Sequence, residues 1–314
     1  MNQPTTHLTP NVEPQLCHVQ CQGPVAALGL QPRRMAYWDW PAGPSGNAHH
    51  AVVCVHGLSR QGRDFDVLAR RLQPHVRVVC PDVAGRGHSD WLADAAQYQI
   101  PTYVGDLLAL LAELRLQGVQ TIDWVGTSMG GLIGLGVSAH PDAALRRLVL
   151  NDVGPVIEPQ ALQRIGSYLG LPLRFDSVQS AADYLLSISA GFGPHTPQEW
   201  LALCAPMLRE DSGAYVLHYD PRIAEPFKAM TGAAALEAAA RGEAVLWHIY
   251  DSITSPTLVL RGASSDLLSA VTAQAMTERG PRARCVAFDG VGHAPTLVAD
   301  DQLRALESFL LGRA

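Results

Sequence analysis

Short runs of consecutive apolar residues alternate with helical patterns along most of the chain. The runs expected to form buried strands are residues 51–56, 76–80, 122–125, 148–150, 257–260 and 284–288. Apolar residues at helical spacing predict helices over residues 64–72, 103–116, 129–140, 268–277 and 299–311. Continuous apolar strands are usually buried on both faces. The alternation therefore predicts an α/β fold with a mostly parallel sheet and helices on both sides.

Residues 154–247 interrupt this alternation. They hold helix-like pieces separated by Pro and Gly, at residues 160–169, 177–190, 198–209 and 233–241. Since a structureless loop of this length is implausible in a compact domain, we expect an inserted helical cap, or lid. The predicted division is a core of residues 15–153 and 248–314, with the cap at 154–247 between its two halves.

The amino-terminal segment is polar and contains proline. Residues 1–14 are expected to form a flexible tail, and residues 18–22 and 35–40 are expected to pair as an antiparallel hairpin. The first basic residue is Arg33 and no apolar stretch precedes it, so no secretory signal is predicted. No stretch reaches the roughly 18 unbroken apolar residues of a membrane helix, and no membrane association is expected.

Composition narrows the function classes. The 314 residues are 47% hydrophobic with a formal net charge of −6 and no basic run, so no nucleic-acid partner is expected. Lys228 is the one lysine in the sequence, which disfavours Schiff-base, pyridoxal and P-loop chemistry. Cys54 and Cys80 stand in apolar runs typical of buried thiols, and the six cysteines show no zinc spacing. We therefore expect a cytoplasmic protein without a metal site.

The central motif is Gly126-Thr127-Ser128-Met129-Gly130. It follows a predicted strand and opens a predicted helix, where glycines on either side allow the sharp turn that lifts a serine hydroxyl above the sheet. The alternative is a tight Gly-rich turn with a bystander serine. The position between strand and helix favours Ser128 as a nucleophile.

A serine nucleophile needs a base, and the base needs an acid. His293 follows the last predicted strand and precedes the last helix, which returns it to the sheet edge that carries Ser128. Asp266 follows the strand at 257–260 at the same edge, giving the chain order Ser–Asp–His. Asp152, at the end of the strand at 148–150, is a rival acid. We expect Asp266 in the triad and Asp152 as a strand-end turn residue.

Two backbone N–H groups are candidates for an oxyanion hole. Met129 follows the nucleophile, and Leu58 lies on the loop after the strand at 51–56, where His56 better fits a structural role. Arg60 on the same loop is a candidate for binding a substrate carboxylate. The cap offers further candidates for substrate contact, Trp200, Met207 and Trp247, although these side chains could equally pack the cap against the core.

Taken together, these motifs resemble the α/β-hydrolase superfamily. The resemblance rests on His56-Gly57, on residues 81–89, on the Gly-x-Ser-x-Gly motif, on residues 264–266 and on Gly292-His293. It implies an eight-stranded sheet with an antiparallel second strand and a cap inserted after the sixth. It is closest to the esterase, enol-lactonase and carbon–carbon bond hydrolase branches. Haloalkane dehalogenases and epoxide hydrolases carry Asp where this chain has Ser128, which excludes both.

The sequence thus predicts a cofactor-free serine hydrolase that cleaves a small-molecule carboxylic ester or lactone through an acyl-enzyme. Hydrolysis of the carbon–carbon bond of a ring-fission product uses the same triad and is the main alternative. A ligand-binding protein on a hydrolase scaffold is a third hypothesis. A homodimer is considered as the assembly.

Overall fold

The computed structural model describes residues 13–21, 32–228 and 232–312, the side chains of 227–239 excepted. Of the predicted tail at 1–14, residues 1–12 lie outside this description, as does Gln22 of the predicted hairpin. None of the helices in these ranges is long and apolar enough to cross a membrane.

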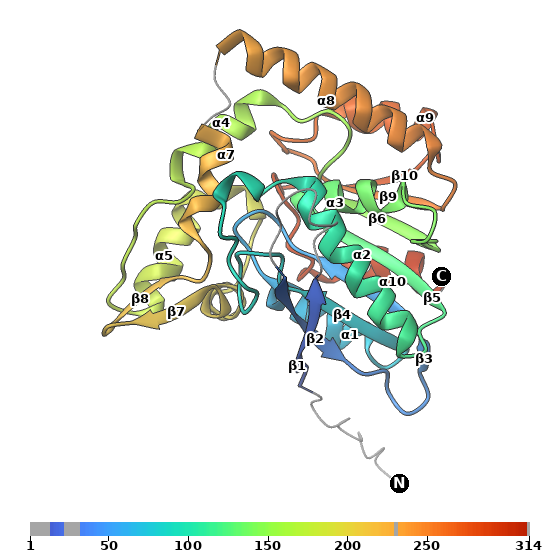
Figure 1. Ribbon diagram of the computed structural model, residues 1–314, viewed down its shortest axis with the longest axis horizontal. Coiled ribbons are helices and arrows are strands. Elements are labelled where there is room, and N and C mark those ends of the chain that lie inside the picture. Colours follow the sequence, from blue (N-terminus) through green and yellow to red (C-terminus); the bar gives the residue numbers. More distant parts are fainter. Residues whose placement is uncertain (1–12, 22–31, 229–231, 313–314) are drawn as a thin grey trace, which may run out of the picture.

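An eight-stranded sheet forms the centre of the molecule (Figure 1). Its order is β1-β2-β4-β3-β5-β6-β9-β10. The strands are β1 (Gln15–Cys21), β2 (Arg33–Trp40), β3 (Asn47–Val55), β4 (Val76–Pro81), β5 (Thr121–Thr127), β6 (Arg147–Asn151), β9 (Thr257–Gly262) and β10 (Arg284–Phe288). β2 pairs antiparallel with β1 and β4, and the remaining pairs are parallel. The predicted hairpin, the mostly parallel sheet and its antiparallel second strand are confirmed.

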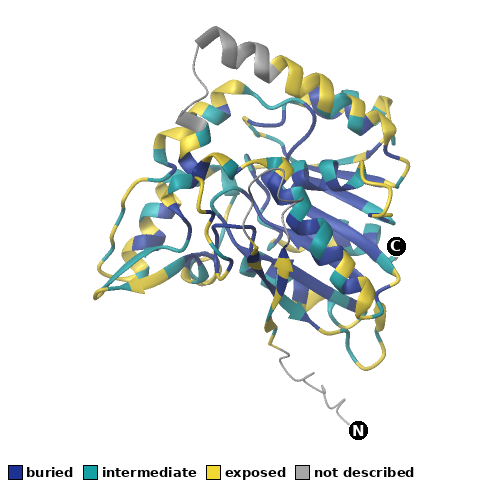
Figure 2. Cartoon of the chain, in the orientation of Figure 1, coloured by how far each residue is buried: buried dark blue, intermediate teal, exposed yellow. Residues whose placement is uncertain are grey.

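Helices cover both faces of the sheet. One face carries α2 (Ile100–Leu116), α3 (Met129–Ser138) and α9 (Ala270–Glu278), and the other carries α1 (Asp66–Leu72) and α10 (Asp300–Leu311). Side chains of β3 alternate between the two cores: Val53 and Val55 face α2 and α3, and Val52 and Cys54 face α1 and α10. Figure 2 shows the resulting pattern of buried strands beneath helices with exposed outer faces.

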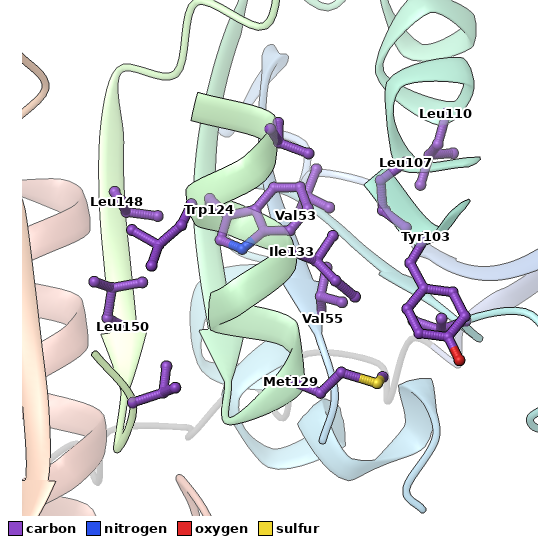
Figure 3. Close-up of a cluster of buried hydrophobic side chains, with 14 of the residues drawn as sticks. Val53, Val55, Tyr103, Leu107, Leu110, Trp124, Met129, Ile133, Leu148 and Leu150 are labelled. Atoms are coloured by element: carbon purple, nitrogen blue, oxygen red, sulfur yellow. The ribbon is translucent and has the colours of Figure 1, made fainter. Parts of the chain in front are cut away.

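Close packing of α3 fixes the position of the central turn. The indole of Trp124 on β5 donates to the carbonyl of Gly130, with its nitrogen 3.1 Å from the oxygen, and lies beneath α3 (Figure 3). A Cβ at Gly134 would come within 2.4 Å of the same indole. The glycines of α3 thus let the helix lie against the strand that leads to Ser128.

The region predicted as a cap holds α4 (Pro159–Tyr168), α5 (Val178–Ile188), α6 (Pro197–Cys204), β7 (Leu208–Asp211), β8 (Ala214–Leu217), α7 (Glu225–Lys228) and the start of α8 (Gly232–Ser252). Short 3₁₀ turns lie in it at Ala190–Phe192, Ala205–Met207 and Pro221–Ala224, and two more lie in the core, at Gly62–Phe65 and Ala95–Gln97. Figure 1 shows α4, α5, α7 and the β7–β8 pair to one side of the sheet. The boundaries of the cap as a domain stay a prediction.

The secondary structure of the predicted cap differs from the sequence prediction in three details. The helix expected over residues 198–209 ends at Cys204, because Pro206 cannot continue it. The chain then forms an unforeseen hairpin, β7–β8, whose turn residues Ser212 and Gly213 both have positive φ, as a tight two-residue turn requires. The predicted boundary at 247 also falls inside α8, which runs on to Ser252.

Candidate active site

Ser128 stands in a sharp turn between β5 and α3. Its φ is 52° and its ψ −117°, a strained conformation for a non-glycine residue. A Cβ on Gly126 would lie 2.3 Å from the Gly130 carbonyl oxygen, and one on Gly130 would lie 2.0 Å from that of Val55. Only glycines fit at these two positions, so the chain can hold the Ser128 hydroxyl above the sheet edge.

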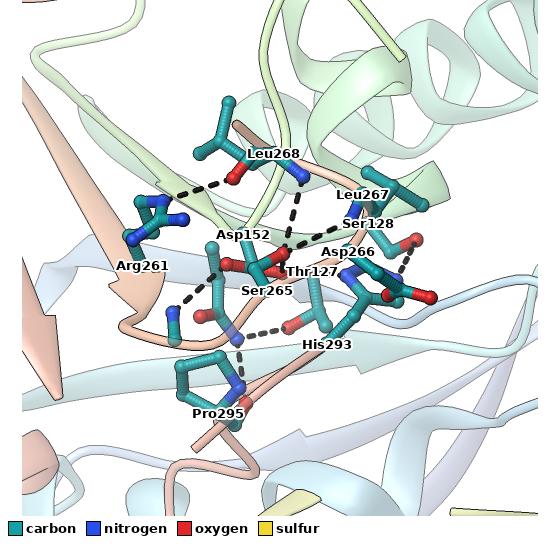
Figure 4. Close-up of polar contacts among 12 residues, drawn as sticks. Thr127, Ser128, Asp152, Arg261, Ser265, Asp266, Leu267, Leu268, His293 and Pro295 are labelled. Carbon is teal, nitrogen blue, oxygen red and sulfur yellow. Dashed lines mark hydrogen bonds and ion pairs between the residues drawn. The ribbon is translucent and has the colours of Figure 1, made fainter. Parts of the chain in front are cut away.

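His293 lies on the loop between β10 and α10 and reaches Ser128. Its Nε2 is 3.0 Å from Ser128 Oγ, and its Nδ1 is 2.6 Å from Asp152 Oδ2 (Figure 4). Only 9% of the His293 side chain is exposed, and Asp152 is fully buried. The three side chains therefore form an unbroken hydrogen-bonded chain, the arrangement that activates a serine.

The carboxylate of Asp152 is held from several directions. It accepts from the backbone N–H of Gly262 at 2.9 Å and from the hydroxyl of Ser265 at 2.6 Å, in addition to His293. Asp152 itself has a φ of 56°, which turns its side chain beneath the histidine directly at the end of β6. These contacts fix which carboxylate oxygen faces His293.

Asp266, the expected acid, lies elsewhere. Its carboxylate accepts from Nε and Nη2 of Arg164 on α4, at 2.7 and 2.9 Å, and 45% of its side chain is exposed. Burial would raise the pKa of Asp266, but the hydrogen bonds and charge of Arg164 outweigh this effect and lower it. The prediction of Asp266 does not agree with this geometry, because the turn after β9 directs Ser265, not Asp266, toward Asp152.

The loop after β3 lies beside Ser128. A Cβ on Gly57 would be 3.8 Å from that of Ser128, which places the neighbouring Leu58 next to the nucleophile. The buried His56 donates from Nδ1 to the Gly57 carbonyl at 2.7 Å and accepts from the N–H of Val83 at Nε2. Burial lowers the pKa of His56 to about 3. A neutral His56 therefore fixes the peptide plane that carries the Leu58 N–H, the structural role expected for it.

A cavity of about 570 Å³ opens above Ser128 and His293. Core loops and cap elements line it together, including Leu58, Ser59, Thr127, Arg164, Tyr168, Ser187, Ser189, Phe192 and Asp266. Arg60 and Met207, both predicted to contact substrate, lie in its wall. The Arg60 guanidinium is paired with Asp64 at 2.6 and 2.8 Å, so its charge is largely compensated.

The two tryptophans predicted to contact substrate do not line this cavity. Trp200 is buried in a small core of the cap, where its indole N–H donates to the Ala182 carbonyl at 2.8 Å. Trp247 packs edge-on against Tyr250 and beneath the guanidinium of Arg279, 4.1 Å from the ring centre. Both side chains pack the protein, which was the alternative interpretation at the sequence level.

Sequence reasoning missed Arg164 and Ser265. Arg164 occupies a helical position in the cap with no motif around it, so nothing in the sequence singles it out. Ser265 belongs to the segment 264–266 that carries the resemblance. In that segment the aspartate, Asp266, was predicted to be the triad acid, and no role was predicted for the serine.

Comparison with known proteins agrees with the observed fold. The model of the alpha/beta hydrolase family matches residues 52–306. The chain belongs to the alpha/beta hydrolase family. A 3-hydroxybutyrate-oligomer hydrolase of Cupriavidus necator is 47% identical over 308 residues, covering 96% of this chain and 99% of that protein. With such a relative across its full length, this member of the family is an enzyme, a hydrolase.

Two further hydrolases are similar over most of the chain. The crystal structure of one from Novosphingobium aromaticivorans has a TM-score of 0.76 and 33% identity, covering 95% of this chain and 98% of that one. The 2-(acetamidomethylene)succinate hydrolase of Mesorhizobium japonicum is 26% identical, covering 82% of this chain and 87% of its own.

Proposed function

We propose that this hydrolase cleaves the ester bonds of short 3-hydroxyalkanoate oligomers through an acyl-enzyme intermediate. The observation that carries the proposal is the hydrogen-bonded chain from Asp152 through His293 to Ser128 at the wall of the cavity. The substrate class is inferred from the 47% identical relative, which is named for the hydrolysis of 3-hydroxybutyrate oligomers.

In the proposed mechanism, Ser128 Oγ attacks the ester carbonyl while His293 Nε2 takes the hydroxyl proton. Asp152 orients the imidazole and stabilises the imidazolium that forms. The N–H groups of Leu58 and Met129 hold the oxyanion of the tetrahedral intermediate. His293 then returns its proton to the departing alkoxide, which leaves as the hydroxyl end of the shortened oligomer. A water molecule, activated by the same histidine, releases the acyl group.

The wall of the cavity carries polar groups among its apolar side chains. Its polar side chains include four serines, one tyrosine and two arginines: Ser59, Ser167, Ser187, Ser189, Tyr168, Arg60 and Arg164. A polyester of a hydroxy acid carries carbonyl oxygens at short intervals and a free carboxylate at one end. Both guanidinium groups are already paired with carboxylates, Arg60 with Asp64 and Arg164 with Asp266. The wall therefore offers hydroxyl groups to the ester oxygens of such a chain, and apolar side chains such as Leu185 and Phe192 to its methyl groups.

Assays of purified enzyme on matched substrates test this proposal. We expect turnover of 3-hydroxybutyrate dimer and trimer, and weaker turnover of a long-chain nitrophenyl ester and a four-membered hydroxybutyrate lactone. Ser128→Ala should lose several orders of magnitude of activity on all of them. Near-normal activity of Ser128→Ala would remove the mechanism. Cleavage of a 2-hydroxy-6-oxo-dienoate in preference to the oligomers would favour carbon–carbon bond hydrolysis instead.

The proposed setting is the reducing cytoplasm. The six cysteines are all free thiols in this structure, and four of them are buried: Cys21, Cys54, Cys80 and Cys204. Thiols of this kind remain reduced in the cytoplasm without any structural role for a disulfide. The homodimer stays a prediction.

A further inference from the structure

Arg86 is a fully buried arginine with neutral hydrogen-bond partners. Its exposed fraction is 0%, and no carboxylate among the described residues lies within ion-pair distance of it. Its Nη1 donates to the carbonyl of Ala84 at 2.6 Å and to the hydroxyl of Tyr103 at 2.9 Å. The ring centres of Tyr98 and Tyr103 lie 5.6 and 5.1 Å from its central carbon.

The other side of the guanidinium faces the candidate oxyanion hole. Nε of Arg86 donates to the carbonyl of Leu58 at 2.8 Å, and Nη2 lies 3.7 Å from the sulfur of Met129. Leu58 and Met129 are the two residues whose N–H groups are proposed to hold the oxyanion. One buried side chain therefore contacts both of them.

Burying a charge without a counter-charge is unfavourable, so a fold that retains one needs a compensating gain. Tyrosine ring faces and carbonyl oxygens supply part of this compensation. The ester oxygen gains a full negative charge only when the carbonyl becomes tetrahedral during the reaction. A fixed positive charge in a low-dielectric surrounding stabilises that charge far more than it stabilises the neutral substrate.

We infer that Arg86 is a positioning residue of the oxyanion hole, which fixes the Leu58 loop and supplies a buried positive charge behind the hole. This inference rests on the proposed function. The hydrogen bonds to the backbone show how the Leu58 loop is fixed. His56 holds the Gly57 carbonyl and Arg86 holds the Leu58 carbonyl, so both peptide planes on either side of the Leu58 Cα are fixed.

The position of Arg86 is itself determined by the loop that carries it. Gly85 and Gly87 have φ values of 83° and 51°, which turn the chain sharply on both sides of the arginine. The cap segment at His218 and Asp220 pairs with this loop: the Gly87 N–H donates to the His218 carbonyl, and the Asp220 N–H donates to that of Gly85. Core and cap thus hold the Arg86 backbone together.

The test uses full-length enzyme and an activated nitrophenyl ester, so that it does not depend on the oligomer being the natural substrate. Arg86→Met removes the charge and keeps much of the volume. We expect kcat to fall by about 10²- to 10³-fold, the size of effect seen when one oxyanion-hole donor is removed. KM should change by less than about threefold, because the ground state gains little from the charge.

A second readout separates positioning from mere stability. A trifluoromethyl ketone adds to Ser128 Oγ: the new oxygen–carbon bond forms, the carbonyl electron pair moves to its oxygen, and the serine proton goes to His293. The resulting anion should bind Arg86→Met more weakly by the same factor as the loss in kcat. Affinity for the corresponding methyl ketone, which stays largely neutral, should change little.

Two further variants complete the test. Arg86→Lys keeps the charge but not the planar fork, and should lie between wild type and Arg86→Met. It also covers the case in which Arg86→Met does not fold. Tyr103→Phe removes a hydrogen-bond partner of Arg86 and leaves the Arg86–Leu58 hydrogen bond in place. We expect it to lower stability and to change kcat by at most about tenfold.

Arg86→Met or Arg86→Lys that melts earlier but keeps wild-type kcat and inhibitor affinity would overturn the inference and leave Arg86 with a purely structural role. Failure of the proposed function is distinguishable whatever the behaviour of the Arg86 variants. Ser128→Ala would remain active if the mechanism failed, and wild-type enzyme would hydrolyse the nitrophenyl ester but not the oligomers if the substrate class failed.

Discussion

Asp152 shows how a single side chain can determine the working state of the whole site. Three donors converge on its carboxylate, and the one on His293 Nδ1 leaves Nε2 free to accept the serine proton. An amide at this position could donate to Nδ1 and would favour the tautomer that cannot act as base.

We therefore predict that Asp152→Asn lowers kcat by about 10⁴-fold, while Asp266→Asn lowers it by less than about tenfold. The smaller effect is expected because Asp266 pairs with Arg164 in a half-exposed ion pair of modest energy. Steady-state kinetics of the two variants, with circular dichroism to confirm folding, provide the measurement. The reverse order of effects would return Asp266 to the triad.

The sequence alone could not show which of the two aspartates, Asp152 or Asp266, pairs with His293. Both follow a strand, both lie between Ser128 and His293 in the chain, and both satisfy the Ser–Asp–His order. What separates them is the positive φ of Asp152 and the presence of Arg164 next to Asp266. A short sequence motif predicts neither a local backbone angle nor a partner that comes from a distant helix. Ser128 and His293 were predictable because the requirements of their chemistry fix their position at strand ends.

His56 makes stability depend on pH. Its pKa is about 3 in the folded protein, because of burial, against an ordinary 6.5. Below pH 6.5 the unfolded chain binds a proton that the folded chain does not, so the stabilisation is complete above pH 6.5 and is lost as pH falls toward 3. The slope is ~1.4 kcal/mol per pH unit.

We predict that His56→Gln, which does not titrate, loses about 2 kcal/mol less stability than wild type between pH 7 and pH 5. Urea unfolding at both values measures this difference. Equal losses in wild type and His56→Gln would contradict the neutral assignment of His56.

At the scale of elements, the close contact between β3 and α3 fixes the position of the Ser128 hydroxyl above the sheet edge. A Cβ on Gly130 would come within 2.0 Å of the Val55 carbonyl oxygen, and backbone cannot move aside as a flexible side chain can. Gly166 in α4 offers a matched control, because a Cβ there meets nothing within 4 Å.

We predict that Gly130→Ala destabilises the protein by at least ~2 kcal/mol and reduces activity. Gly166→Ala should stabilise it by up to ~1 kcal/mol, since alanine is the better helix former. Denaturant unfolding of both variants measures the difference. A Gly130→Ala enzyme of wild-type stability would contradict close packing of α3 against β3.

Most elements of the core were predictable, since strands buried on both faces and amphipathic helices leave strong patterns. The cap was less predictable. The β7–β8 hairpin spans two strands of four residues each, with none of the continuous apolar character of the central strands. Its turn, Ser212-Gly213, is a weaker signal than Asn-Gly or Asp-Gly.

At the scale of the whole molecule, Arg60 connects the core to the cap. It lies on the loop after β3, pairs with Asp64, and donates to the Leu203 carbonyl of the cap at 3.3 Å. Its guanidinium also lies 5.7 Å from the ring centre of Phe192. Both members of the ion pair are mostly buried, with exposed fractions of 10% and 17%.

We predict that Arg60→Met costs ~3 kcal/mol, because it leaves the Asp64 carboxylate buried without its partner. The double variant Arg60→Met/Asp64→Leu should recover most of this loss. Arg174→Met, which breaks an exposed ion pair with Asp211 inside the cap, should cost less than ~1 kcal/mol. Urea unfolding compares all three, and equal costs for Arg60→Met and Arg174→Met would contradict a buried link between cap and core.

The central claim is that Ser128 carries the acyl group during ester hydrolysis. Rapid acid quenching of wild-type enzyme with 3-hydroxybutyrate trimer, followed by peptide mass spectrometry, tests it most directly. We predict a transient mass increase of one or more 3-hydroxybutyryl groups on the peptide that contains Ser128, and none in Ser128→Ala. Steady hydrolysis of the trimer by Ser128→Ala, or an acyl group found on a different residue, would contradict the account.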